Sequence, residues 1–376
     1  MAYDVAVVGA GIVGLAHALA AAKCGKKVVV LDRDATANGA SIRNFGFVTV
    51  TGQQAGDCWQ LARRSRDVWA DVVDKARIDV LHEGLLVAAR YEESDAVIDA
   101  FLDTEMGHGC QRLTPRDASQ RSPALKVNQL RSVLYSPHEM RVESRDALPR
   151  LAEWLEFVWK VDFLWSTAVH SVETPKLETT RGEIYADVVL VCPGNDYLTL
   201  FADRIARYKP TACKLQMLRV SPETSVRLGA AVMSDFGLAR YLGYSELPEA
   251  EPLIRRLEAE QTDMRSNGIH LIAVQSADGS LVVGDSHEYG ETLTPFVSSR
   301  VNDLILSELD AVLDLGARQI CETWIGTYAS AKDRWRFTDQ PDDATRIVVV
   351  TAGCGASTAF GIAEETVGAL YGRTFQ

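Results

Sequence analysis

The chain of 376 residues is long enough for two domains with a large core, and its 47% hydrophobic and 24% charged residues are typical of a globular protein. A formal net charge of −12 disfavours nucleic acid and anionic lipid as main partners, although it is compatible with an anionic small molecule. The seven cysteines include no CxxC pair and no His/Cys cluster with zinc spacing, so we expect reduced cytosolic thiols, no metal site and a cytoplasmic location.

The first predicted elements form a strand–helix–strand unit. A short β-branched run over residues 4–8 is followed by a helix of small residues over 12–24 and by a second strand over 27–32. The nearly apolar stretch 5–22 contains three glycines and His17 and has no basic segment before it. It therefore predicts a buried strand, a turn and a helix, and not a membrane span.

A glycine-rich turn joins this first strand to the helix. Gly9 permits the tight turn, Gly11 lets the backbone approach a pyrophosphate, and Gly14 lets the helix pack closely on the sheet. The second strand ends in Asp32, where an acid accepts hydrogen bonds from a ribose; this argues against a 2′-phosphate, although the adjacent Arg33 leaves that question open. A glycine turn that only packs a helix is the alternative, but the surrounding pattern favours dinucleotide binding.

Further elements follow in chain order. Apolar spacing predicts amphipathic helices over 59–80, 146–159 and 299–315. Strands are expected over 161–165, 168–172, 176–180, 188–191 and 346–350, and the segment 208–290 reads as rich in strands, with a hairpin of 270–275 and 280–284. A glycine-rich segment over 352–358 then begins a final helix. Strand–turn–helix units at both ends, with a different pattern of predicted elements between them, indicate a nucleotide domain interrupted by a second domain.

Two more segments resemble flavoprotein motifs. Residues 180–194 resemble the turn and strand that end in glycine beside FAD, and residues 353–358 begin a helix directly after a buried strand. Together with 9–14, 40–46 and 324–333, they make the chain resemble the D-amino acid oxidase-like family of FAD oxidoreductases, which includes the glycine and sarcosine oxidases.

This resemblance implies an α/β fold in which a Rossmann-type FAD-binding domain is interleaved with a mixed-sheet (α+β) substrate domain. The expected FAD-binding domain comprises 1–50, 140–205 and 325–376, and the expected substrate domain comprises 51–139 and 206–324. In such proteins the late glycine-rich helix start faces the flavin O2 and stabilises the negative charge of the reduced ring.

The resemblance also assigns cofactor contacts. Ser41 and its neighbours would surround the pyrophosphate and the ring, and the backbone of Val169 would meet the adenine, although a valine in an ordinary core strand fits that position equally well. The residues expected to bind FAD are Gly9, Gly11, Ile12, Val13, Gly14, Asp32, Arg33, Ser41, Ile42, Asn44, Val169, Pro193, Gly194, Gly353, Cys354, Gly355, Ala356, Ser357 and Thr358.

Two familiar substrate clamps of the family are missing. The arginine of its Gly-Leu-Arg-Pro segment is replaced by Tyr328, and the lysine that follows the late glycines in sarcosine oxidases is absent from 359–361. A plain α-amino acid substrate is therefore in doubt. Since the cofactor performs the oxidation, no catalytic triad or carboxylate pair is expected.

Segments 40–53 and 284–289 resemble a subgroup of these oxidoreductases associated with phosphonate metabolism. The resemblance implies a small anionic amine as substrate, such as 2-aminoethylphosphonate or an N-alkyl derivative, and a phosphonate favours several cationic donors. The residues expected to bind it are Arg43, Asn44, His287 and Tyr328, with a cation from Lys332, Arg334 or Arg336. Two alternatives stay open: a sarcosine-, glycine- or D-amino acid-type oxidase or dehydrogenase with Arg43 as the carboxylate clamp, and a flavin-binding electron-relay subunit without turnover.

Overall fold

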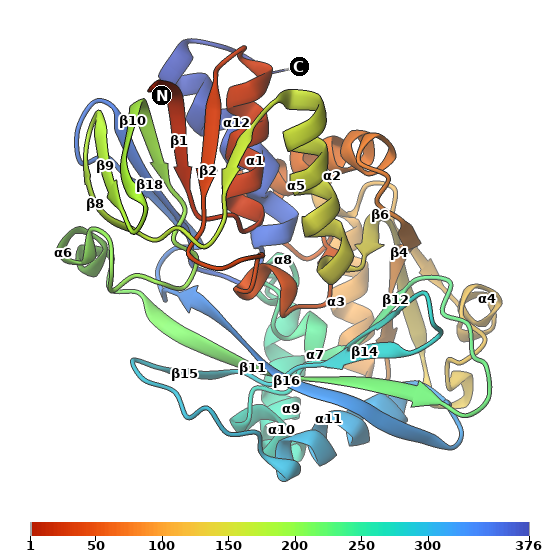
Figure 1. Cartoon of the computed structure of the whole chain (residues 1–376). Coiled ribbons are helices and arrows are strands. Elements are labelled where there is room, and N and C mark those ends of the chain that lie inside the picture. Colours follow the sequence, from red (N-terminus) through yellow and green to blue (C-terminus); the bar gives the residue numbers. More distant parts are fainter. Residues whose placement is uncertain (1, 376) are drawn as a thin grey trace.

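Two β-sheets form the framework, one above the other in the view of Figure 1, in a computed structural model that describes residues 2–375. The first sheet has the strand order β17-β18-β10-β1-β2-β7, with β8 and β9 added beside β10. Its strands are β1 (Ala2–Val8), β2 (Val28–Leu31), β7 (Asp162–Leu164), β8 (Val169–Glu173), β9 (Lys176–Thr179), β10 (Gly182–Val191), β17 (Arg336–Asp339) and β18 (Thr345–Val350).

The centre of the first sheet is parallel, as the β-branched runs predict. β1 pairs in parallel with β2 on one side and with β10 on the other, and β18 and β7 extend the parallel set. Val5 and Val7 are completely buried because both faces of β1 are covered. The neighbours of β1 lie on opposite sides of it, so the order reverses there, and ligands of open α/β sheets bind at such a point.

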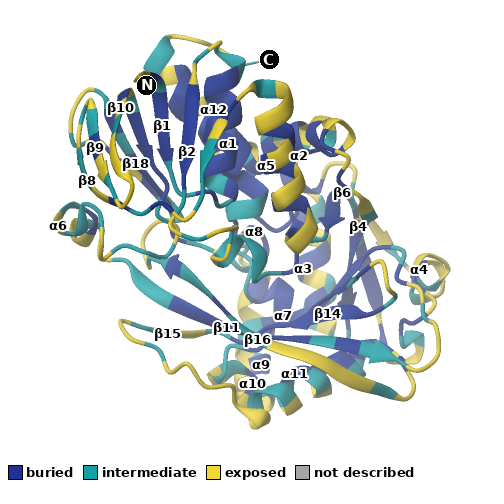
Figure 2. Ribbon diagram, viewed as in Figure 1, coloured by how far each residue is buried: buried dark blue, intermediate teal, exposed yellow. Residues whose placement is uncertain are grey.

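Four helices pack in one core against this sheet: α1 (Ile12–Lys23), α2 (Asp57–Lys75), α5 (Ser144–Trp159) and α12 (Gly355–Tyr371). Helices α1 and α12 lie side by side although they come from opposite ends of the chain (Figure 1). The central strands and the facing sides of these helices are buried (Figure 2). The parallel sheet with its covering helices confirms the predicted α/β fold class.

The second sheet is mostly antiparallel, with order β15-β11-β14-β13-β12-β4-β6-β3, and with β16 beside β11 and β5 beside β6. The one exception among its described pairings is the parallel pair of β12 and β4. Its strands are β3 (Phe47–Val48), β4 (Val80–Ala89), β5 (Gln111–Leu113), β6 (Ser132–Val142), β11 (Thr211–Pro222), β12 (Ala231–Ser234), β13 (Ile272–Gln275), β14 (Leu281–Gly284), β15 (Glu288–Gly290) and β16 (Arg318–Ser330).

Helices accompany the second sheet more than the sequence pattern indicates. The remaining α-helices are α3 (Glu92–Leu102), α4 (Pro115–Arg121), α6 (Ala202–Ile205), α7 (Asp235–Leu238), α8 (Leu242–Ser245), α9 (Ala250–Glu260), α10 (Thr262–Ser266) and α11 (Ser299–Val312). The expectation that 208–290 is rich in strands is therefore wrong for 235–266. Leu253 and Leu257, four residues apart, bury one face of α9 in the core of this sheet. The helix predicted over 59–80 likewise ends earlier, at Lys75, and Val80 is the first residue of β4.

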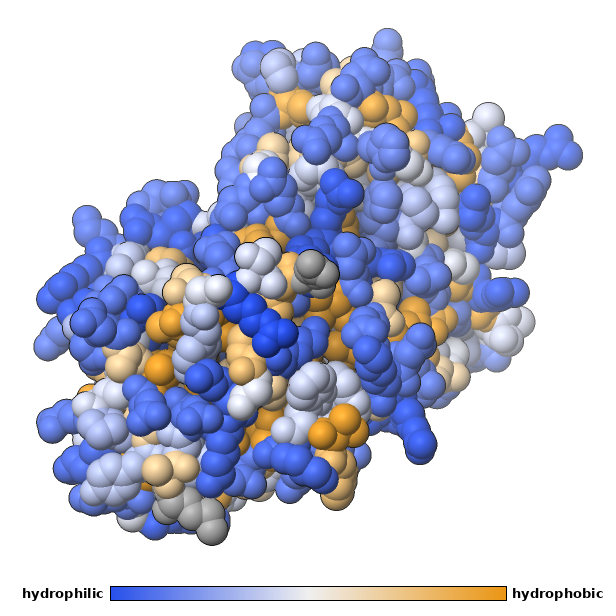
Figure 3. Space-filling view, turned by 90° about the horizontal axis from the view of Figure 1, so that it is seen from above, coloured by the Kyte–Doolittle hydropathy of each residue, from blue (hydrophilic) through white to orange (hydrophobic). Residues whose placement is uncertain are grey.

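The proposed domain ranges differ from the sheets at three places. The boundary at residue 140 cuts β6, which belongs to the second sheet as far as Val142. A boundary at residue 325 cuts β16, which pairs with β11 over nearly its whole length, and β3 lies in the second sheet although it precedes residue 50. Figure 3 shows a face dominated by hydrophilic side chains, with hydrophobic ones gathered toward the middle of the view. Among residues 2–375, no helix is both long and apolar enough to cross a membrane.

Candidate functional site

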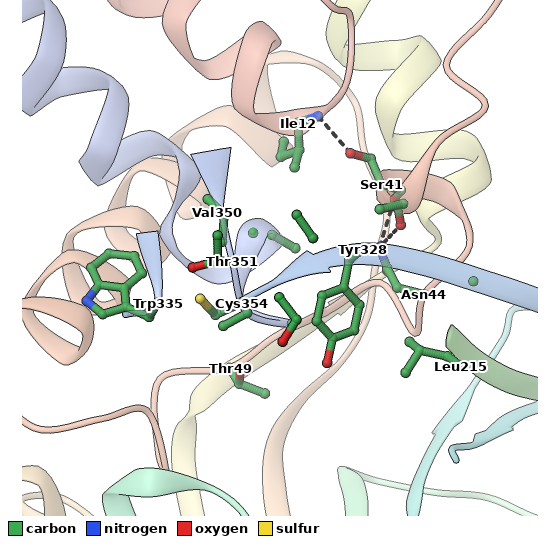
Figure 4. Close-up of a pocket in the computed structure, with 18 of the residues that line it drawn as sticks. Ile12, Ser41, Asn44, Thr49, Leu215, Tyr328, Trp335, Val350, Thr351 and Cys354 are labelled. Carbon is green, nitrogen blue, oxygen red and sulfur yellow. Dashed lines mark hydrogen bonds between the residues drawn. The ribbon is translucent and has the colours of Figure 1, made fainter. Parts of the chain in front are cut away.

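A cavity of about 430 Å³ lies between the two sheets. The first glycine turn, the segment 40–54, strand β16 and the segment 350–356 line it, and residues between 240 and 289 close it on the side of the second sheet. It therefore opens beyond the carboxyl ends of β1, β10 and β18, the position expected for a ligand of a parallel sheet. Figure 4 shows Tyr328 projecting from β16 into this space, with Thr351 and Cys354 on one side and Ser41 and Asn44 on the other.

The first glycine turn leaves no room for side chains. Gly9 has a φ of +106°, and a Cβ added there would lie 2.4 Å from the carbonyl oxygen of Cys192. A Cβ on Gly14 would lie 1.8 Å from the carbonyl oxygen of Gly9, because α1 packs directly on the turn. The close packing brings the N-terminus of α1, with its free amide groups, to the cavity.

Two polar side chains brace this turn. The Asp32 carboxylate accepts a hydrogen bond from the amide of Ala10 at 2.7 Å, and the Ser41 hydroxyl accepts one from the amide of Ile12 at 3.0 Å (Figure 4). Ser41 is carried by a short 3-10 helix, η1 (Ala40–Ile42). Asp32 thus holds the turn from the side away from the cavity, while Ser41 lies at the N-terminus of α1 on the cavity side, where a phosphate oxygen would also approach the Ile12 amide.

The second glycine turn reaches the same cavity from the other end of the chain. Gly353, Cys354, Gly355 and Ala356 all line it, and α12 begins at Gly355. The amides of the first turn of a helix have no acceptor within that helix, so this turn offers donors to an electron-rich ligand. Ser357 and Thr358, in contrast, are buried.

The hydroxyls of these two buried residues have partners within the protein. The Ser357 hydroxyl accepts a hydrogen bond from the amide of Thr49 at 2.8 Å, and Thr358 donates one to the Cys354 carbonyl at 2.9 Å. Neither residue lines the cavity, because each step along a helix turns the side chain by about 100°.

The structure gathers about half of the residues expected to bind FAD. Those that line the cavity are Gly11, Ile12, Val13, Gly14, Ser41, Asn44, Gly194, Gly353, Cys354, Gly355 and Ala356. Those outside its lining are Gly9, Asp32, Arg33, Ile42, Val169, Pro193, Ser357 and Thr358. Arg33 is exposed and forms an ion pair with Asp196 at 2.6 Å, and Val169 is a buried strand residue of β8.

Among the residues expected to bind substrate, Arg43, Asn44, His287 and Tyr328 line the cavity. The Asn44 side chain is occupied by the backbone around it: its amide donates to the Ala40 carbonyl at 2.8 Å, and its oxygen accepts from the Gly46 amide at 2.6 Å. Asn44 therefore shapes the η1 turn and has little capacity left for a substrate.

The structure does not bring Lys332 or Arg334 to the cavity, so it gives no support to the expectation that they bind substrate. Both are exposed, and Arg334 pairs with the neighbouring Asp333 at 2.5 Å. Arg336, the third candidate cation, forms ion pairs with Asp57 and Glu365. The chain turns between β16 and β17 and directs Lys332 and Arg334 to the outer surface, whereas Arg336, in β17, is half-buried.

Arg240 is the cation that the sequence pattern does not reveal. It lines the cavity just after α7, and it donates a hydrogen bond to the Tyr289 hydroxyl at 2.9 Å. Within the described part of the chain, no carboxylate lies within 4.0 Å of its guanidinium. Burial raises the pKa of Tyr328 well above its usual value, so its hydroxyl stays protonated and can donate to a ligand.

Comparison with known proteins independently supports the interpretation of this cavity as a cofactor site. The model of the family described as DAO, FAD dependent oxidoreductase, matches residues 4–369. The chain belongs to this family. The family accounts for the two glycine turns at one cavity: these FAD-dependent oxidoreductases bind FAD, and both turns suit it. The backbone amides of Ile12 and Val13 with Ser41 would hold the pyrophosphate, and Cys354 to Ala356 would lie at the ring.

Relatives of the FAD-dependent oxidoreductase family share the fold across the whole chain. A curated glycine oxidase from Geobacillus kaustophilus (strain HTA426) is 25% identical over 210 residues, which are 51% of this chain and 54% of that relative, so the match spans about half of its length. The crystal structure of glycine oxidase from Geobacillus kaustophilus has a TM-score of 0.77 at 19% identity, covering 100% of this chain and 96% of that one.

Two other solved structures are similar at low identity. L-proline dehydrogenase from P. horikoshii has a TM-score of 0.79 at 17% identity and covers 99% of this chain and 94% of that one. L-alpha-glycerophosphate oxidase from Mycoplasma pneumoniae, with FAD bound, has a TM-score of 0.72 at 15% identity and covers 100% of this chain and 97% of that one.

In residues 2–375 of this chain, no group of three or more His, Cys, Asp or Glu side chains could hold a metal ion, and the seven cysteines are free thiols.

Proposed function

We propose that this protein oxidises a small amine that carries an anionic group, and that the substrate is an aminophosphonate such as 2-aminoethylphosphonate or an N-alkyl derivative. The products would be an aldehyde and ammonia, or an alkylamine, after hydrolysis of the imine. Bound FAD supplies the electron-accepting chemistry of this reaction. The chain's own residues bind the substrate, orient it and exclude water.

The observation that carries the proposal is Arg240. A guanidinium at the wall of the cavity, without a carboxylate partner, is an anion site that the protein itself leaves incomplete. The Tyr289 hydroxyl lies 2.9 Å from it, and the hydroxyl of Tyr328 faces the same cavity. These donors suit a phosphonate, which has three oxygens and is close to a dianion at neutral pH.

Arg240 also bears on the missing arginine of β16. By the resemblance to glycine oxidase-like sequences, Tyr328 stands where those proteins carry the arginine that binds the substrate carboxylate. In this chain the cation comes from Arg240, just after α7, instead. The anion would therefore be held from a different direction. Apolar side chains such as Leu215, Trp335 and Val350 form much of the remaining wall (Figure 4), and they would hold the carbon chain away from water.

A second candidate is an oxidase or dehydrogenase of the glycine, sarcosine or D-amino acid type. The similarity to a glycine oxidase favours it, and one arginine can bind a carboxylate in a bidentate manner. In this case Arg240, or Arg43 as first expected, would be the carboxylate clamp.

The flavin spectrum separates these candidates. The purified FAD-loaded protein would be titrated without oxygen with 2-aminoethylphosphonate, its N-methyl derivative, sarcosine, glycine and D-alanine. We expect the two phosphonates to bleach the flavin absorbance fastest. Reduction by the carboxylates alone would contradict the phosphonate proposal and support the second candidate. A flavin that no amine reduces would support the electron-relay alternative.

A further inference from the structure

Asp285 places a second unpaired charge in the same cavity. This residue is only 4% exposed and lines the cavity directly after β14. Two backbone hydrogen bonds with His270 hold it in place: the His270 amide donates to the Asp285 carbonyl at 2.9 Å, and the Asp285 amide donates to the His270 carbonyl at 2.5 Å. The carboxylate is thus anchored by the adjoining ends of β13 and β14 and is not carried on a loose loop.

The only basic side chains within 4 Å of this carboxylate, among those of residues 2–375, are two imidazoles. Nδ1 of His270 lies 3.4 Å from Oδ1 of Asp285, and Nδ1 of His287 lies 3.6 Å from it. Nδ1 of His287 also lies 3.0 Å from the carbonyl oxygen of Gly268, which can only accept, so the proton is on Nδ1.

Both imidazoles are neutral at pH 7. Burial lowers the pKa of His287 to about 3 and also lowers the pKa of His270. Burial by itself would raise the pKa of Asp285, but the hydrogen bond with His270 and the charge of Arg240 oppose that effect, and the pKa lies below its ordinary value. Asp285 is therefore a buried anion whose neighbours at contact distance carry no full positive charge, and such a charge is costly unless a partner arrives.

Arg240 and Asp285 together form two opposite charges in one cavity. They are close enough to influence each other, yet their charged atoms are not within the 4.0 Å of an ion pair. A ligand that carries an anionic group at one end and an ammonium at the other would supply each with its missing partner.

We propose that Asp285 binds the protonated amine of the substrate while Arg240 binds its anionic group, so that the cavity selects zwitterions over anions that lack nitrogen. The inference rests on the proposed function and adds the recognition of the ammonium end. The two histidines act as positioning residues that hold the carboxylate. The class of ligand follows from the pair of charges: a short amine with a phosphonate or carboxylate a few bonds away.

Isosteric ligands that cannot be oxidised test this without turnover. In 2-amino-2-methylpropylphosphonate the carbon beside nitrogen has no hydrogen, and in 2,2-dimethylpropylphosphonate a methyl group replaces the ammonium. Each would be titrated into the FAD-loaded protein at pH 7, with the dissociation constant read from the perturbation of the flavin spectrum. The variants are Asp285→Asn and, as a matched control, Asp333→Asn, whose side chain is exposed and outside the cavity.

In the wild type and in D333N, the dissociation constant of the ammonium ligand should be at least about tenfold lower than that of its methyl counterpart, as expected for one ion pair in a partly buried site. D285N should lose this preference and bind the methyl ligand about as well as the wild type does. An Arg240→Gln variant should weaken both ligands and keep their ratio. A preference that persists in D285N would overturn the inference.

A second ligand pair separates this inference from the phosphonate proposal. 2-Aminoisobutyrate and pivalate differ in the same way but carry a carboxylate. If only this pair binds, and its preference for nitrogen disappears in D285N, then Asp285 is the ammonium site while the phosphonate assignment fails. If the wild type shows no preference for nitrogen in either pair, the inference itself is wrong.

Discussion

Replacing Arg240 by glutamine tests the anion site most directly. The change removes a charged fork but keeps a polar side chain of similar reach. Its hydrogen-bond partner Tyr289 is 53% exposed, so water can replace the lost contact and the fold should tolerate the change. Since FAD would lie on the side of the two glycine turns, the ratio of FAD to protein should be unchanged.

The magnitude follows from the contacts that a guanidinium makes with an anion. Each hydrogen bond to a charged group contributes about 1.5–3 kcal/mol, so losing a bidentate pair should cost about 3 kcal/mol or more. At 1.4 kcal/mol for each factor of ten, the rate constant of flavin reduction divided by the dissociation constant should fall about 150-fold. Arg240→Lys keeps the charge without the fork, and we expect it to fall about tenfold.

Anaerobic stopped-flow measurement of flavin reduction provides the assay. Arg334→Gln is the matched control, because Arg334 is exposed and outside the cavity, and it should stay within about twofold of the wild type, as surface substitutions do. Arg43→Gln examines the other arginine that lines the cavity. The reasoning is refuted if R240Q reduces as fast as R334Q, and the clamp moves to Arg43 if only R43Q is impaired.

Two further predictions concern cofactor binding and stability. Gly14→Ala should lower the FAD content and the thermal midpoint, since its Cβ would lie 1.8 Å from the Gly9 carbonyl oxygen. Gly39→Ala, whose Cβ would have nothing within 4 Å, should leave both unchanged. The ratio of flavin to protein absorbance and thermal melts measure the two effects, and a normal FAD content in G14A would contradict the expected clash. Burial lowers the pKa of His17 to about 4, so the folded state resists a proton that the unfolded chain accepts below about pH 6.5, and stability is lost as the pH falls from about 6.5 to about 4. Between pH 7 and 4.5 the wild type should lose about 2–3 kcal/mol more of its unfolding free energy than His17→Gln does, measured in urea. Equal losses would show that His17 is not responsible.

The cofactor side could be predicted from the sequence because its signals are local. The positive φ at Gly9 and the close approach at Gly14 depend on residues a few positions apart, and β-branched runs predict buried parallel strands wherever they stand. The late turn at 353–356 carries the same kind of signal. That both turns meet at one cavity follows from the sheet order, in which β1 lies beside β10 and β10 beside β18.

The substrate side could not be predicted in the same way. Arg240 follows a four-residue helix inside a segment that reads as strands, and nothing near it in sequence marks it as a ligand. Its place at the cavity depends on where the second sheet packs, as does the meeting of Asp285 with His270 across a hairpin. Lys332 and Arg334 show the converse, because they lie close to cavity residues along the chain and yet point outward.

By itself, then, the amino-acid sequence determined the glycine turns and the α/β framework, since backbone sterics and hydrophobic periodicity act over a few residues. The class of cofactor followed from the resemblance of its motifs to a family of FAD oxidoreductases. Only the tertiary structure decided which charges face the substrate. A charge at the surface is solvated wherever it stands, and it becomes a binding group only when distant segments enclose it together and remove the water around it.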